Sequence, residues 1–141
     1  MGRAHWAAAA IVAGFAGLAT SYAAAMVLTI RDAPVVAVAE VIIDFTPGAV
    51  VERAIKVLGH ADKPALMFAL FLIHLAVFAV IGLRARQSWW QPIVSWVLLA
   101  MIWLGAVLGQ AGAGPVDVLP VVVGLITWIT VHAALNDPIN L

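Results

Sequence analysis

The chain has 141 residues, of which 65% are hydrophobic and only 10% are charged, and its formal net charge is zero. A soluble domain of this size needs far more polar surface, so we expect an integral membrane protein with a single domain. The balanced charge argues against nucleic-acid binding. The absence of cysteine excludes disulfides, thiolate metal sites and a cysteine nucleophile. The lipid bilayer is therefore the first partner that the composition predicts.

The first apolar segment, residues 7–30, contains no charged side chain. At about 24 residues it is long enough to cross a membrane and too long for a cleaved export signal, so we expect a retained anchor. Small residues recur in it at every fourth position: Ala9, Ala13, Gly17, Ser21 and Ala25. Small residues at this spacing let another helix approach closely. Ala13 and Gly17 are therefore predicted contacts for a neighbouring helix or for another membrane subunit.

The next segment, residues 31–63, carries nine of the fourteen charged side chains. Pro47 suits the first position of a helix, with Thr46 as its cap, and Gly59 suits the left-handed residue that ends one. We predict two short helices hinged at residues 44–48. They lie on the membrane surface or re-enter the membrane, and the sequence leaves both arrangements open.

The polar side chains of this segment predict a hinge that presents a docking surface. Asp44 is expected to accept backbone N–H groups of the hinge, and Glu40, one turn earlier, is expected to pair with Arg53 or Lys56. The alternative is that the two carboxylates bind a cation or relay a proton. The second helix is amphipathic, with Glu52 placed four residues before Lys56 for an ion pair. The predicted hinge and docking residues are Glu40, Asp44, Thr46, Pro47, Gly48, Glu52, Arg53 and Lys56.

Three further apolar segments, residues 65–83, 92–109 and 118–135, are each close to the length that crosses a hydrocarbon core of about 30 Å. Gly105 and Gly109 form a GxxxG motif, which favours helix packing against another membrane subunit. The predicted fold is an all-α integral membrane protein. It has four transmembrane helices and two short interfacial or re-entrant helices between the first and the second.

We call residues 31–63 the outer segment. The basic residues elsewhere in the chain predict how the chain is oriented in the membrane. Arg3, Arg84 and Arg86 lie on one side of a four-span layout, and Trp89 and Trp90 stand beside them at the expected membrane interface. Because short cytoplasmic loops are enriched in Lys and Arg, this side and the N-terminus are predicted to be cytoplasmic, with residues 31–63 outside.

Two histidines lie inside predicted spans, where an ionisable residue is a functional candidate. One interpretation is that His74 is a ligand of haem b or donates a hydrogen bond to a quinone. The other is that it is a neutral side chain bonded to a neighbouring helix. His132 is its natural partner, but it lies about 7 Å deeper by helical rise, so one haem held by both needs strongly tilted helices. Trp96 and Trp103, seven residues apart, are predicted to pack in the core and not to form a ligand cage.

The outer segment resembles a known family. Glu40, the run Ile43-Asp44-Phe45-Thr46-Pro47-Gly48, an amphipathic helix over residues 50–58, Gly59 and Asp62-Lys63 follow a similar pattern there. The family is the N-terminal membrane domain of sulfite-oxidase-type molybdopterin-dependent oxidoreductases from actinobacteria and related prokaryotes. The resemblance implies a multi-pass domain in the prokaryotic cell membrane, with the catalytic domain outside. The family's catalytic residues have no positions in this sequence, which leaves two expectations, a truncated protein or a free-standing subunit.

Two functions from different classes follow. No catalytic triad order, phosphate-binding loop or HExxH motif is present, so the chain is expected to be non-catalytic. The first function is a cofactor-free membrane anchor that docks a redox protein. The alternative is an electron-transfer subunit that binds haem b or quinone at His74 or His132.

Overall fold

The computed structural model describes residues 2–30 and 33–136, without the side chains of His60, Asp62 and Lys63. Regular secondary structure in these residues is helical throughout. The helices are α1 (Arg3–Val27), α2 (Pro34–Phe45), α3 (Gly48–Leu58), α4 (Asp62–Ala85), α5 (Trp90–Leu108) and α6 (Leu119–Asn136), with 3-10 turns η1 (Gly59–Ala61) and η2 (Pro115–Val118). Four of them, α1, α4, α5 and α6 with η2, are long and apolar enough to cross a membrane. The predicted fold of a multi-pass, all-α membrane protein is confirmed.

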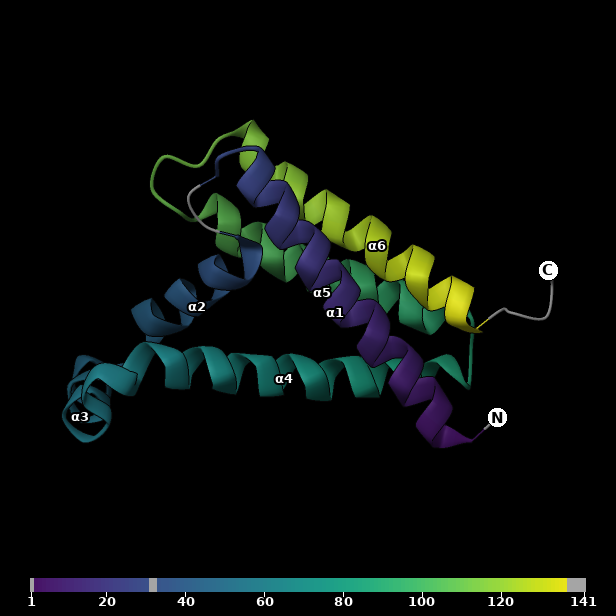
Figure 1. The fold of residues 1–141 in the computed structure, drawn as a ribbon, viewed down its shortest axis with the longest axis horizontal. Helices are drawn as coiled ribbons and strands as arrows, with labels where there is room; N and C mark the ends of the chain where they lie inside the picture. The colour runs from purple at the N-terminus through teal and green to yellow at the C-terminus, as the bar shows by residue number, and fades with distance from the viewer. Residues whose placement is uncertain (1, 31–32, 137–141) are drawn as a thin grey trace.

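The four long helices form a bundle that runs up and down. Both ends of the described chain lie at one end of it, and the connection between α5 and α6 lies at the other (Figure 1). Helix α1 packs most extensively against α6 and next against α4. Arg3 and Arg86 line one surface depression at the terminal end, beside the exposed Trp89 and Trp90. The basic and aromatic residues used to predict the orientation therefore share one end.

The row of small residues on α1 is buried inside the bundle. A Cβ atom added at Gly17 would overlap the indole ring of Trp128 and lie 2.9 Å from the carbonyl oxygen of Gly124. The predicted close approach of a helix is therefore confirmed, and that helix is α6 of the same chain. The prediction that Ala13 and Gly17 contact a separate subunit is wrong, because both are buried against the chain's own helices. Gly105 of α5 and Gly109, which directly follows α5, are both exposed.

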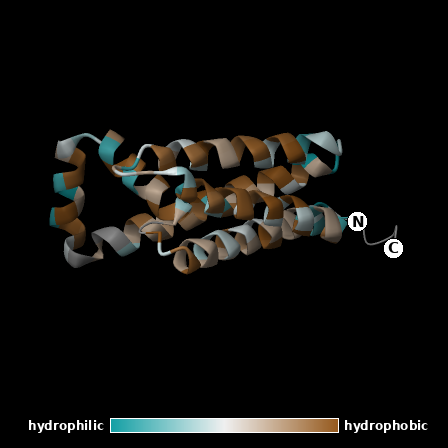
Figure 2. Cartoon of the chain, turned by 90° about the horizontal axis from the view of Figure 1, so that it is seen from above, coloured by the Kyte–Doolittle hydropathy of each residue, from teal (hydrophilic) through white to brown (hydrophobic). Residues whose placement is uncertain are grey.

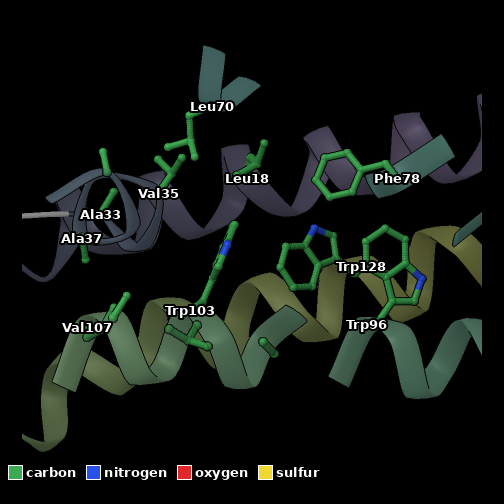
Figure 3. Close-up of a cluster of buried hydrophobic side chains, with 14 of the residues drawn as sticks. Leu18, Ala33, Val35, Ala37, Leu70, Phe78, Trp96, Trp103, Val107 and Trp128 are labelled. Atoms are coloured by element: carbon green, nitrogen blue, oxygen red, sulfur yellow. The ribbon is translucent and has the colours of Figure 1, made fainter. Parts of the chain in front are cut away.

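Large aromatic side chains from three helices fill the centre of the bundle (Figure 3). Phe78, Trp96, Trp103 and Trp128 are each at most 1% exposed. The rings of Trp96 and Trp128 stack at 5.2 Å between centroids, and Trp103 meets Trp128 edge to face at 4.6 Å. Such pairs stabilise a core beyond the effect of their burial. Trp96 and Trp103 are core residues, as predicted.

Helices α2 and α3 form an elbow between the first and second spans. The chain bends by 114° between them, and Gly59, with φ 58°, ends α3. The buried residues of α2 lie in its N-terminal half and include Val35 and Ala37, and α2 packs mainly against α5. No residue of α3 is buried, and α3 lies across the end of the bundle (Figure 2). Two helices hinged at residues 44–48 are confirmed; residues 31 and 32, at the start of the outer segment, lie outside the described residues.

Candidate functional site

Thr46 stabilises the turn of the elbow by a hydrogen bond to α2, and not by capping α3. Its hydroxyl donates to the carbonyl oxygen of Ile42 at 2.6 Å. Helix α3 begins at Gly48, and the Pro47 carbonyl accepts its first backbone hydrogen bonds, from Val50 and Val51. The prediction that Thr46 caps the second helix is therefore wrong. A threonine hydroxyl readily bonds the carbonyl four residues earlier, and Pro47 forces residue 46 into an extended conformation that ends α2.

The two carboxylates of the elbow have different surroundings from those predicted. Glu40 is half-buried and lines a depression of about 310 Å³ with Gln110 and Asp117, beside the α5–α6 turn. Asp44 is exposed, and neither carboxylate makes an ion pair or hydrogen bond among the described side chains. Because α3 turns away by 114°, Glu40 faces the α5–α6 connection, and its expected pairing with Arg53 or Lys56 does not form.

Helix α3 separates a charged face from an apolar one. Glu52, Arg53 and Lys56 are exposed, and the described structure contains no ion pair between Glu52 and Lys56. The apolar side chains Val50, Val51 and Ile55 line a groove of about 320 Å³ that α3 shares with α2 and Leu66. The charged side chains of α3 therefore do not line the groove that α3 shares with α2.

His74 of α4 is buried, and both of its ring nitrogens are engaged. The indole N–H of Trp103 donates to Nε2 at 3.3 Å, and Nδ1 lies 2.8 Å from the Leu70 carbonyl oxygen. An indole nitrogen only donates and a carbonyl oxygen only accepts, so His74 is the neutral Nδ1–H tautomer. This is the arrangement expected of a side chain bonded to a neighbouring helix, and it leaves neither nitrogen with a free lone pair for a metal.

His132 of α6 is also buried, but its surroundings differ. Its ring meets Trp96 edge to face at 5.8 Å, and its Nδ1 atom has no hydrogen-bond partner in the described part of the chain. With Trp96 it lines a pocket of about 680 Å³ at the terminal end of the bundle. We call this the His132 pocket; its walls include Trp6, Arg86, Trp89, Trp96, His132 and Asn136.

The structure does not bring the two histidines together. One line of ring contacts runs from His74 through Phe78 and Trp96 to His132. A second line runs from His74 through Trp103 and Trp128 to Trp96. Aromatic rings therefore separate the two imidazoles along both lines, in the space in which a haem shared by both would lie. A single haem with both as axial ligands does not fit this arrangement.

Sequence reasoning assigned Arg86 and Trp89 to topology and Trp96 to packing, and missed that they meet at His132. One signal was available: in an up-and-down bundle the end of α4, the start of α5 and the end of α6 lie at the same end of the bundle.

Comparison with known protein families, with curated proteins and with solved structures gives no match for the chain. The fold and its sites thus define a multi-pass helical membrane protein with an elbow at one end and a pocket at the other.

Proposed function

We propose that the chain is a non-catalytic membrane anchor whose elbow docks a redox protein. The observation that carries the proposal is the position of α3, which has no buried residue and lies across the end of the bundle (Figure 2). Its charged residues Glu52, Arg53 and Lys56 are exposed. A charged, solvated helix held beside a membrane is suited to orient a water-soluble partner by electrostatic complementarity.

The elbow has the rigidity that docking requires. Helix α2 buries its N-terminal half in the bundle, and at its other end Thr46 bonds the carbonyl oxygen of Ile42. The bend is therefore anchored to the transmembrane core and does not depend on contacts made by α3 alone. A surface that is ordered before binding loses less entropy when the partner docks.

The family resemblance supports the same function and suggests the partner. The resemblance covers most of the chain from Pro34 onward, and its central pattern, from Glu40 through Ile43–Gly48 and Gly59 to Asp62-Lys63, lies in the outer segment. In that family a molybdopterin-dependent catalytic domain accompanies the membrane domain. We propose that a domain of this type docks on the elbow, at the outer face of a prokaryotic cell membrane, with the N-terminus in the cytoplasm.

Site-specific photocrosslinking in native membranes tests this function. A benzoylphenylalanine at Arg53 is expected to capture a protein that releases molybdopterin on denaturation and is identified by mass spectrometry. The matched control is the same residue at Ile102 of α5, which is 62% exposed on the apolar surface of the bundle. Capture of lipid alone at Arg53, or of the same protein at both positions, would contradict docking on the elbow.

The sequence leaves open the alternative of a haem b or quinone site at His74 or His132, and at His74 this alternative has less support. Its Nε2 atom accepts the indole N–H of Trp103, so an iron ligand there requires that hydrogen bond to break. The visible absorption spectrum of the purified protein tests this alternative. A Soret band that is lost in His74→Ala would establish it and would overturn the anchor function as the sole one.

A further inference from the structure

The His132 pocket is separate from the elbow, at the opposite end of the bundle, and nothing in the docking function uses it. Two of its wall residues are almost completely buried, Trp96 at 1% and His132 at 7% exposure. Both keep a polar atom without a partner in the described part of the chain, Trp96 Nε1 and His132 Nδ1. Buried polar groups are nearly always hydrogen-bonded, so two unpartnered groups in neighbouring rings require an explanation.

The geometry directs at least one of these groups out of the aromatic core. The Trp96 indole stacks on Trp128, and its nitrogen lies on the side of the ring away from Trp128 (Figure 3). Trp103 and Trp128 instead donate their indole N–H groups within the protein, to His74 and to the Gly14 carbonyl oxygen. Among these three core tryptophans, Trp96 alone lines the pocket. Its N–H group therefore has no partner among the core rings and belongs to a residue of the pocket wall.

The pocket walls define the chemistry of such a molecule. Trp6, Trp89, Trp96 and His132 supply flat aromatic surfaces, against which a ring packs well. An indole N–H only donates, so the ligand needs an acceptor oxygen, whereas the imidazole Nδ1 either donates or accepts. The volume of about 680 Å³ lies in the range of about 300–1,000 Å³ typical of small-molecule sites.

The described pocket wall offers a buried anion a single, exposed cationic partner, which favours a neutral ligand. In the described wall the charged side chain is Arg86, which is exposed. A buried phosphate would depend on this one solvated guanidinium, and the unpartnered Oδ1 of Asn136 would repel it. We propose that the His132 pocket binds a membrane-soluble quinone, with one ring carbonyl accepting the indole N–H of Trp96.

Binding is tested on the full chain in phosphatidylcholine nanodiscs, with tryptophan labelled by ¹⁵N and decylubiquinone as the probe. The chain has six tryptophans, and Trp→Phe variants assign their indole N–H signals. We expect the Trp96 signal to shift and to saturate with added decylubiquinone, while those of Trp103 and Trp128 stay in place. Shifts of all indole signals that grow without saturation would mean partition into lipid, and would overturn the proposal.

A matched pair of variants identifies the hydrogen bond. Trp96→Phe keeps a ring at the pocket wall and removes only the proposed donor, so affinity for decylubiquinone should fall about five-fold, the size of one net hydrogen bond. Trp103→Phe removes a donor that serves His74, and affinity should be unchanged. Equal affinity of wild type and Trp96→Phe, with both variants folded by circular dichroism, would overturn the assignment.

A second series distinguishes a quinone from an anionic lipid headgroup. Nanodiscs that contain phosphatidylglycerol should leave the Trp96 signal where it stands in phosphatidylcholine. If phosphatidylglycerol shifts that signal and decylubiquinone does not, the pocket binds anionic lipid and the quinone proposal fails.

Discussion

Two histidines with similar burial have different surroundings in this bundle. His74 and His132 are 4% and 7% exposed, and each meets a tryptophan of α5 at about the same distance, 6.0 Å to Trp103 and 5.8 Å to Trp96. His74 nevertheless has both ring nitrogens engaged within the protein. His132 has an Nδ1 atom without a partner in the described residues and lines a pocket.

The difference shows that burial and residue type do not by themselves separate a structural histidine from a binding one. A satisfied imidazole between helices stabilises and orients them, because loss of either partner leaves a buried polar group unpaired. An unsatisfied one beside a pocket has already been desolvated, so a ligand that bonds it removes a cost that the free protein carries. The following substitutions test this distinction.

The largest effect is expected from removal of each imidazole. His74→Leu leaves the buried indole N–H of Trp103 without an acceptor, which should lower the free energy of unfolding by about 1–3 kcal/mol. His132→Leu removes a group with an unpaired nitrogen and should cost distinctly less. Unfolding of the two variants in the same detergent measures the difference, and equal losses would mean that His132 has a partner of its own.

Double substitutions sharpen the same comparison. Trp103→Phe and His74→Leu remove the two ends of one hydrogen bond, so their effects should couple by about 0.5–3 kcal/mol. Trp96→Phe and His132→Leu share ring contact but no hydrogen bond, and their coupling should fall at or below the lower end of that range. A larger coupling in the second pair would contradict the distinction.

Even without a substitution, the rate of hydrogen exchange of the indole N–H groups should distinguish Trp96 from Trp103 and Trp128. The N–H groups of Trp103 and Trp128 are bonded within the protein, whereas that of Trp96 is not. Trp96 should therefore exchange faster than the other two in nanodiscs without ligand, because exchange requires a hydrogen bond to open. Deuterium uptake followed by NMR measures the three rates, and similar rates would indicate that Trp96 is also bonded.

The smallest effect is expected at the elbow, at Asp44. It is exposed and makes no hydrogen bond among the described residues, so Asp44→Asn and Asp44→Ala should each change the free energy of unfolding by no more than about 0.5 kcal/mol. If Asp44 accepted hinge N–H groups, as the sequence predicts, alanine would cost more than asparagine, because the amide oxygen of asparagine still accepts. Thermal unfolding of both variants decides this, and a marked loss in Asp44→Ala alone would restore the predicted role as an acceptor in the hinge.

Local features of the elbow were predictable in part. The break at Thr46-Pro47 and the stop at Gly59 follow from the backbone restrictions of proline and glycine, which act on adjacent residues whatever the fold. The partners of Thr46 and Glu40 were not predictable in this way. Thr46 lies between the end of α2 and the start of α3, and the sequence does not determine which helix its hydroxyl bonds. Glu40 faces a turn more than sixty residues away in the sequence, which becomes its neighbour only after the bundle has formed.

The sequence by itself determined the class of the protein, its four spans and the position of the elbow. These depend on length, apolar composition and turn residues, which are properties of short segments. Tertiary structure decided that Gly17 packs against α6 of its own chain, that His74 is satisfied by Trp103, and that His132, Trp96 and Arg86 share a pocket. The reason is physical. A side chain's partners depend on how each helix is rotated and shifted against the others, and the packing of the whole bundle sets that arrangement.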